Sequence, residues 1–288
     1  MPQLYGFLSK LYSIGYKESD FDIVFLNSRV IPKEKIQKKA KKILENITKY
    51  RYLVTFDDAA FKYVGIPASK KGIPVVFSGL NYPFEKYKKE YNLPDNNICG
   101  VYEKFYTAEI LKAFNKIKPI KKIAILYSKG IGEIGTRQIM SEIKGTIFEK
   151  KVTLIYVKNM KDLERKTKMV NKNKDFTLFI PQTLSLKDDN KKIPFYKLKE
   201  VYLKNIKKPD YSINISFATL GFLGFGGENY FKMGKQAAEI FLQYKKTNKP
   251  IIQNAKEYYF FFNYKRAKEI NFIYPDWFIK KHIKDIIW

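Results

Sequence analysis

The chain alternates short apolar runs with longer amphipathic runs, and this alternation limits the possible folds more than any other feature. The apolar runs are rich in β-branched residues, as is typical of buried parallel strands. We expect strands at 22–26, 52–56, 74–77, 123–127, 152–157, 176–180 and 211–216. We expect helices at 4–14, 33–49, 58–64, 107–117, 133–143, 161–171, 196–205, 230–244 and 276–286. Strands that alternate with helices predict βαβ units, parallel sheets and an α/β fold.

Two connections predict that the chain forms two lobes. The 288 residues, of which 45% are hydrophobic, are enough for two separate cores. Pro119 lies between a helix and a strand and cannot continue the helix. The segment ATLGFLGFGG at 218–227 contains four glycines and allows a flexible or close-approach connection.

The net charge of +27 makes nucleic acid the first partner to consider. Of the 55 basic residues, however, only five are arginine, which leaves 50 lysines spread along the whole chain. Proteins that read bases and phosphates favour the bidentate fork of arginine. We therefore expect no nucleic-acid partner and attribute the lysines to compositional bias, with weak attraction to anionic surfaces.

Cysteine and histidine are too rare for several kinds of site. Cys99 is the only cysteine, so no internal disulfide forms, and His282 is the only histidine. A single histidine argues against a histidine-based metal site or catalytic triad. We expect no metal, no cofactor and no catalysis.

Three predicted strands end in small polar residues, where open α/β sheets bind their ligands. Asp57 and Asp58 follow the strand in YLVTFDDAAF, where either residue can also cap the next helix. Ser78, Gly79 and Asn81 end the run IPVVFSGLN, which is equally compatible with a plain turn. The third end is IPQTLS, which contains Gln182, Thr183 and Ser185.

A fourth strand end, LYSKGIGEIG, contains Ser128 and matches the spacing GxGxxG. The dinucleotide fingerprint also requires an acidic residue about 20 positions further on. Residues 150–152 are basic or apolar instead, which argues against a dinucleotide site.

Taken in order, these segments resemble the periplasmic substrate-binding proteins of ABC transporters, in the group that includes tryptophan- and tyrosine-type binding proteins. The matching segments are VTFDDAAF (54–61), IPVVFSGLNYP (73–83), NICGVYE (97–103), IAILYS (123–128), IPQTLSLKD (180–188), LGFLGFGGENYFKMGKQAAEIF (220–241) and FNYKRAKEINFIYPDWFIKK (262–281). The last contains Asn263, Ala267 and Pro275 at the places of the family's closing pattern. Cys99 stands where the family carries Thr.

The resemblance implies a type I periplasmic-binding fold with two Rossmann-like lobes and three crossovers. Lobe one would hold 1–118 and 219–250, and lobe two 119–218 and 251–288. The ligand would lie between the lobes. Its contacts would come from Asp58, Ser78, Gly79 and Asn81 in lobe one, from Tyr127, Ser128, Gln182 and Thr183 in lobe two, and from Phe225 and Glu228 in the crossover.

The chemistry of these groups favours an amino acid with an apolar or aromatic side chain. Hydroxyls and amides bind a carboxylate, Asp58 or Glu228 binds an ammonium group, and aromatic rings bind an apolar side chain. The partners implied are a membrane permease and its ATPase.

The amino terminus departs from the family pattern. Family members begin with an exported leader and a strand, whereas this chain begins with the helix LYGFLSKLYSIGY. The first residues, MPQLYGFLSK, are too polar for a signal-peptide core. We expect lobe one to lack its first strand, and Met1 to be an internal methionine of a longer gene or the start of a decayed one. The resemblance implies a periplasmic or extracytoplasmic location.

Two other functions fit the same residues less well. A ligand sensor that feeds a membrane histidine kinase would keep the fold and need a partner chain. A two-lobed transferase would need a base or an acidic metal cluster. The only close acidic pairs are Asp57-Asp58 and Asp188-Asp189, and the second lies in the turn-like KDDNKK.

Overall fold

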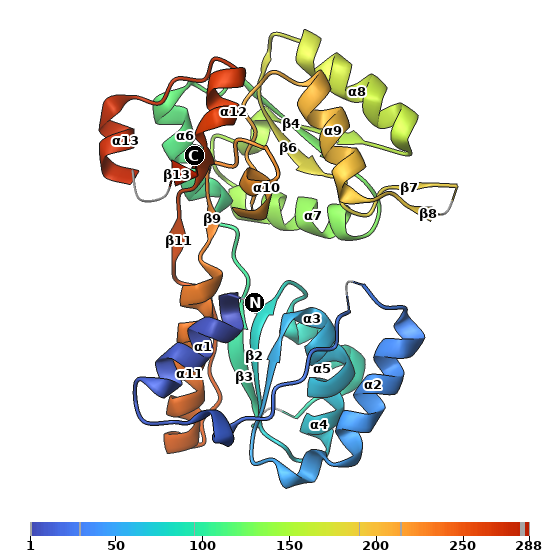
Figure 1. The fold of residues 1–288 in the computed structure, drawn as a ribbon, viewed down its shortest axis with the longest axis vertical. Coiled ribbons are helices and arrows are strands. Elements are labelled where there is room, and N and C mark those ends of the chain that lie inside the picture. The colour runs from blue at the N-terminus through green and yellow to red at the C-terminus, as the bar shows by residue number, and fades with distance from the viewer. Residues whose placement is uncertain are drawn as a thin grey trace. The chain divides into compact units, whose positions relative to one another are not determined.

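The computed structural model describes residues 2–28, 30–94, 96–189, 191–213, 215–282 and 286–287. The chain divides into two compact units, each with its own parallel sheet (Figure 1). Unit 1 comprises residues 1–104 and 229–257, and unit 2 comprises residues 105–228 and 258–288. The chain therefore crosses between the units three times.

The sheet of unit 1 contains four parallel strands in the order β1-β2-β3-β10. These are β1 (Leu53–Phe56), β2 (Val75–Leu80), β3 (Ile98–Tyr102) and β10 (Ile252–Asn254). Successive side chains of a strand point to opposite faces, so both faces of β2 need a cover. Val76 packs with helices on one face, and Val75 and Phe77 pack with helices on the other.

One face of this sheet is covered by α1 (Pro2–Tyr12) and α11 (Tyr230–Thr247), which lie side by side (Figure 1). The two helices approach closely because glycines lie at the contact. A Cβ atom on Gly6 would lie 1.9 Å from the carbonyl oxygen of Phe231, and one on Gly234 would lie 2.0 Å from that of Gln3. Only glycine fits at either position without a shift of the backbone.

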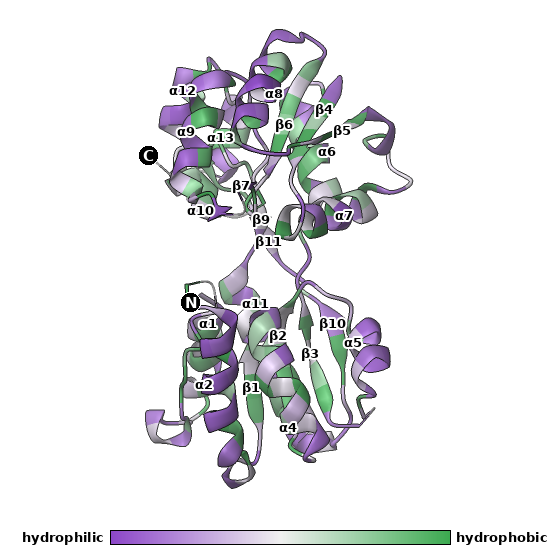
Figure 2. Ribbon diagram, turned by 90° about the vertical axis from the view of Figure 1, so that its right-hand side faces the viewer, coloured by the Kyte–Doolittle hydropathy of each residue, from purple (hydrophilic) through white to green (hydrophobic). Residues whose placement is uncertain are grey.

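The other face of the sheet is covered by short helices that follow β1 and β2. They are α3 (Asp57–Ala60), a π-helical turn (Phe61–Gly65), α4 (Ile66–Lys70) and α5 (Phe84–Tyr91). Unit 1 also contains α2 (Lys33–Glu45), most of whose residues are hydrophilic (Figure 2), and two 3₁₀ turns, Glu18–Asp20 and Ile47–Lys49.

The sheet of unit 2 has the order β5-β4-β6 and is also parallel. Its strands are β4 (Lys122–Tyr127), β5 (Val152–Tyr156) and β6 (Phe176–Gln182). In β4 the alternation is strict: Ile123 and Ile125 belong to one apolar cluster, and Ala124 and Leu126 belong to the other. Both faces of β4 are thus buried.

Helices cover both faces of this second sheet. The helices of unit 2 are α6 (Thr107–Ile117), α7 (Ile131–Ile143), α8 (Met160–Lys172), α9 (Phe195–Asn205), α10 (Ile215–Thr219), α12 (Tyr264–Glu269) and α13 (Asp276–His282), with a 3₁₀ turn at Glu149–Lys151. Short paired segments complete the unit: β7 (Lys187–Asp188), β8 (Lys191–Lys192), β9 (Gly227–Glu228), β11 (Tyr258–Tyr259), β12 (Phe262–Asn263) and β13 (Ile286–Ile287). None of the described helices is both long and apolar enough to cross a membrane.

The predicted strands at 22–26 and 211–216 are wrong. Residues 21–27 form neither helix nor strand, and across residues 2–28 and 30–52 no strand forms at all. A strand needs a neighbour for its backbone groups, and β1 pairs only with β2. In the second segment Ser212 forms a single bridge with Phe225, Asp210 just before it forms another with Phe179, and α10 begins at Ile215.

The division between the units also differs from the expected lobe boundaries at 118/119, 218/219 and 250/251. It falls at 104/105, 228/229 and 257/258. Helix α6 belongs to unit 2 because Ile110, Leu111 and Phe114 pack with the strand residues Ile123 and Ile125. The break at Pro119 therefore ends a helix inside unit 2. Of the expected helix 276–286, residues 276–282 are helical and residues 283–285 lie outside the described part of the chain.

Candidate functional site

In unit 1 the carboxyl ends of β1 and β2 bring Asp58 and Asn81 together. The Asp58 carboxylate accepts hydrogen bonds from the backbone amide of Asn81 (3.2 Å), its side-chain amide (3.3 Å) and the backbone amide of Tyr82 (3.2 Å). The hydroxyl of Tyr87 on α5 donates a fourth bond at 3.2 Å. Asp58 therefore links the turn after β1 to the turn after β2.

Burial controls the electrostatics of this group. Removal from water raises the pKa of Asp58 above its usual value of 3.8, although the amides of Asn81 and Tyr82 act in the opposite direction. Burial and the nearby Asp58 carboxylate likewise raise the pKa of the Tyr87 hydroxyl, which therefore stays protonated and donates its bond. A cation placed beside Asp58 would lower its pKa again.

The turn into α3 is strained at Asp57. Asp57 has a φ angle of 77°, in the left-handed region that few side chains adopt. Its Oδ1 accepts a 2.8 Å hydrogen bond from the backbone amide of Asp58. A π-helical turn follows at Phe61–Gly65. Strained backbone and π-turns are frequent at functional sites, and both occur here beside Asp58.

Ser78 and Gly79 lie near the end of β2, at an irregularity in its pairing with β3 between Ser78 and Leu80. The Ser78 hydroxyl is fully buried and has no hydrogen-bond partner among the described residues. Gly79 has a φ angle of 80°, and a Cβ atom there would lie 2.3 Å from the side-chain nitrogen of Gln3 on α1. In this structure the space beside Gly79 is thus filled by Gln3.

In unit 2 the carboxyl ends of β4 and β6 bring Ser128 and Gln182 together. Tyr127 and Gln182 are paired in the parallel register, and the Ser128 amide donates to the Gln182 carbonyl at 3.1 Å. The Ser128 hydroxyl is buried and has no hydrogen-bond partner among the described residues. The Tyr127 ring lies 5.6 Å from that of Tyr156 at the end of β5.

The glycines of GIGEIG serve the packing of α7 on this strand end. A Cβ atom on Gly132 would lie 1.9 Å from the Gln182 carbonyl oxygen, and one on Gly135 would lie 2.6 Å from its side-chain oxygen. Ser185 fastens the start of the helix, since its hydroxyl donates to the Lys129 carbonyl at 2.7 Å and accepts from the Gly132 amide at 3.3 Å. The GxGxxG spacing here is therefore accounted for by close helix packing.

Thr183 is engaged within the protein. Its hydroxyl lies 3.1 Å from the hydroxyl of Tyr202 on α9, and both groups are buried. Burial raises the pKa of the Tyr202 hydroxyl, which therefore stays neutral. In this conformation the Thr183 hydroxyl links the end of β6 to α9.

The remaining two predicted residues lie apart from this strand end. Phe225 is fully buried in the apolar core of unit 2, with its ring 5.0 Å from that of Phe114 and 5.5 Å from that of Phe278. The expected ligand contact of Phe225 is corrected here, because an aromatic ring buried in this core has no free face for a ligand. Glu228 is buried in β9 and pairs with Tyr258 of β11.

No pattern in the sequence singles out Gln3, Tyr82 and Tyr87, although they contact the predicted residues of unit 1. Tyr87 lies on the buried face of an amphipathic helix and was indistinguishable from a core residue. Gln3 is buried on α1, and its position beside the predicted site is evident only from its contact with Gly79 in the structure. No local pattern in the sequence encodes a contact between segments so far apart.

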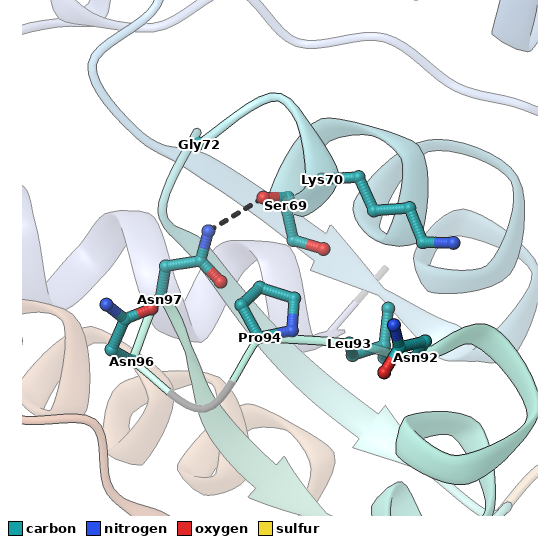
Figure 3. A pocket seen from close by; sticks show the side chains of 8 residues that line it. All are labelled: Ser69, Lys70, Gly72, Asn92, Leu93, Pro94, Asn96 and Asn97. Atoms are coloured by element: carbon teal, nitrogen blue, oxygen red, sulfur yellow. Dashed lines mark hydrogen bonds between the residues drawn. The ribbon is translucent and has the colours of Figure 1, made fainter.

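An open pocket of about 490 Å³ lies at the opposite end of the unit 1 sheet (Figure 3). It is lined by Ser69, Lys70, Gly72, Asn92, Leu93, Pro94, Asn96 and Asn97. These residues precede β2 and β3, so the pocket lies at the amino ends of the strands. In Figure 3 the Asn97 side chain donates to the Ser69 carbonyl at 2.8 Å, which braces the wall. Since open α/β sheets bind ligands at the carboxyl ends, we place the candidate site at Asp58 and Asn81.

Comparison with known proteins shows the family. The sequence model described as "ABC transporter substrate binding protein" matches residues 2–285. Among curated proteins no match was found.

Solved structures show the fold. An ABC domain from Streptococcus pneumonia in complex with L-Trp aligns with a TM-score of 0.67 and 17% identity, over 99% of this chain and 94% of that one. A substrate-binding protein with adhesive properties from Clostridium difficile, in a ligand-free, open structure, aligns with a TM-score of 0.64 and 13% identity, over 96% and 91%. A periplasmic ribose ABC transporter protein from Conexibacter woesei aligns with a TM-score of 0.58 and 12% identity, over 94% of this chain and 88% of that one. The predicted type I periplasmic-binding fold is confirmed.

Proposed function

Because the chain belongs to the family of ABC transporter substrate-binding proteins, we propose that it captures a small molecule and delivers it unchanged to the permease of an ABC transporter. Substrate-binding proteins of this family act outside the cytoplasm, and we propose the same location here. The family match over residues 2–285 is the observation that carries the proposal.

We propose an amino acid with an apolar or aromatic side chain as the ligand. Asp58, half-buried and next to the amide of Asn81, offers a carboxylate to an ammonium group, and an ammonium group would favour its charged form. The buried hydroxyls of Ser78 and Ser128 are donors suited to a carboxylate. The relative with L-Trp bound supports the same ligand class.

Each unit contributes its own proposed set of ligand groups. In unit 1 these are Asp58, Ser78, Gly79 and Asn81, and in unit 2 they are Tyr127, Ser128, Gln182, Thr183 and Glu228. Gly79 and Thr183 would act indirectly, through Gln3 and Tyr202, because these neighbours occupy the adjacent space. The proposal thus separates direct contacts from supporting residues.

Thermal unfolding with a panel of amino acids and other metabolites tests the proposal. A ligand at 100 times its Kd adds about 2.7 kcal/mol to the free energy of unfolding, which appears as a raised Tm. We expect a shift with tryptophan, tyrosine or phenylalanine and none with charged amino acids. A panel that leaves Tm unchanged, or conversion of the bound compound to a product, would contradict the proposal.

A matched pair of variants locates the site. Asp58→Asn removes the proposed ammonium contact, and we expect it to weaken binding at least tenfold. Asp188→Asn changes an exposed carboxylate on β7 and should leave the affinity unchanged. Equal affinities of the two variants, measured by calorimetry, would remove Asp58 from the site.

A further inference from the structure

Three consecutive apolar residues of unit 1 are exposed to solvent. Ile23, Val24 and Phe25 are 44%, 52% and 50% exposed, in a segment without helix or strand. The segment is held against α2, because the Phe25 carbonyl accepts a hydrogen bond from Lys39 and the next residue, Leu26, packs with Ala40. Isolated exposed apolar side chains are ordinary, whereas a contiguous group marks an interaction surface.

The outer face of α2 beside this segment is basic. Ile36 and Ala40 point into the protein, while Lys35, Lys38 and Lys42 recur at helical spacing and are exposed. Within residues 2–28 and 30–94, no carboxylate forms an ion pair with any of these three lysines. A solvated lysine face alone is common, but here it adjoins an exposed apolar group.

We propose that this surface, defined by residues 23–25 and by Lys35, Lys38 and Lys42, docks on an anionic lipid bilayer. Lysines attract anionic headgroups, and apolar side chains enter the boundary between headgroups and acyl chains. The net charge of +27 adds long-range attraction to such a surface. The inference goes beyond ligand capture, since it concerns where the protein lies while it works.

A bilayer fits this surface better than nucleic acid does. Helix α2 contains no arginine, so it lacks the bidentate fork that binds phosphates in nucleic-acid grooves. Two aliphatic side chains, Ile23 and Val24, gain nothing from contact with a phosphate backbone. Their transfer from water to a lipid boundary is favourable, because it removes apolar surface from water.

Vesicle sedimentation with the full chain tests the proposal. We expect binding to phosphatidylglycerol-phosphatidylcholine vesicles, weaker binding at high salt because the charges are screened, and no binding to pure phosphatidylcholine. The variant Lys35→Gln/Lys38→Gln/Lys42→Gln should weaken binding at least tenfold, since each lysine near an anionic surface contributes roughly fivefold. Val24→Ser/Phe25→Ser should remove the binding that persists at high salt.

A control variant removes the same charge elsewhere. Lys161→Gln/Lys172→Gln/Lys174→Gln changes three exposed lysines of unit 2 and should weaken binding less than threefold. Equal losses in the two triple variants would overturn the proposal in favour of net charge alone. Equal binding to vesicles with and without phosphatidylglycerol would also overturn it. The same holds if a DNA duplex releases the protein from the vesicles at a phosphate concentration below that of the anionic lipid. Circular dichroism melts establish that each variant is folded.

Discussion

The carboxylate of Asp58 holds both amides of Asn81, the backbone N–H at 3.2 Å and the side-chain NH₂ at 3.3 Å. The two residues lie 23 positions apart in the sequence, and the contact joins the turn after β1 to the turn after β2. Tyr82 and Tyr87 add two more donors to the same carboxylate. The first proposed ligand residue is therefore also the link that shapes its end of the sheet.

Replacement of Asp58 by Asn should destabilise unit 1. The new NH₂ group faces N–H donors, so at least one buried donor loses its acceptor, at about 1–3 kcal/mol. Urea unfolding at pH 7 measures the change in the free energy of unfolding. Asp188→Asn, on the exposed β7, is the control and should lie within about 0.5 kcal/mol of wild type. A change of that small size in Asp58→Asn would show that the four hydrogen bonds contribute nothing net.

The same variant should change how stability depends on pH. Burial raises the pKa of Asp58 in the folded protein above its usual 3.8, so the folded state binds this proton more tightly than the unfolded chain. The resulting stabilisation is fully present below pH 3.8 and is lost as the pH rises through the folded pKa. Asp58→Asn should therefore be more destabilising, relative to wild type, at pH 4 than at pH 7.

Denaturant titrations of both proteins between pH 4 and pH 7 measure that difference. Subtraction of one protein from the other cancels the remaining carboxyl groups, among them Asp210, whose pKa burial also raises. A difference that stays constant with pH, or that grows toward pH 7, would mean that the folded pKa is not raised.

The sequence predicted the sheets best where apolar β-branched runs meet polar ends. The runs 52–56 and 123–127 became β1 and β4, and helix 107–117 formed with the predicted bounds. The contacts of Asp58 with Asn81, and of Ser128 with Gln182, agree with the rule that parallel strands end at one edge of a sheet. Local pattern and topology were sufficient for these.

The errors arose where tertiary context decides. Residues 22–26 have a strand-like composition but no neighbouring strand to pair with, so they stay irregular, and all of them except Leu26 are exposed. Phe225 lies in a glycine-rich segment that predicts a flexible or close-approach connection, yet its ring is buried against Phe114 and Phe278. No proline or glycine marks the crossing at 104/105. The chain passes from unit 1 to unit 2 directly after the end of β3.

Loss of the Thr183 hydroxyl should destabilise unit 2 through Tyr202. Thr183→Val leaves the buried hydroxyl of Tyr202 without its partner at 3.1 Å, at a cost of about 1–3 kcal/mol. Thr183→Ser keeps the hydroxyl and should cost less. The double variant Thr183→Val/Tyr202→Phe should recover part of the loss, and a double-mutant cycle in urea measures the coupling. Strictly additive effects would show that the two hydroxyls do not interact.

Gly132→Ala and Gly135→Ala should differ in their effect on stability. The first new methyl group would meet backbone, whereas the second would meet a side chain. At Gly132 the new methyl group would meet the Gln182 carbonyl oxygen at 1.9 Å, so α7 must move away from β6, at about 1–3 kcal/mol or more. At Gly135 it would meet the end of the Gln182 side chain at 2.6 Å, which can rotate aside. Gly135→Ala should therefore cost less, and the higher helix propensity of alanine offsets part of that cost.

Thermal melts of the two variants, with Ile134→Ala at an exposed position of the same helix as the control, measure the order. We expect the lowest Tm for Gly132→Ala and a near-native Tm for Ile134→Ala. If Gly132→Ala proved as stable as Gly135→Ala, Gly132 of α7 would not pack closely against the Gln182 carbonyl oxygen. The glycine spacing at 130–135 would then need a reason other than helix packing, and a phosphate-bearing ligand at that turn would be the next one to test.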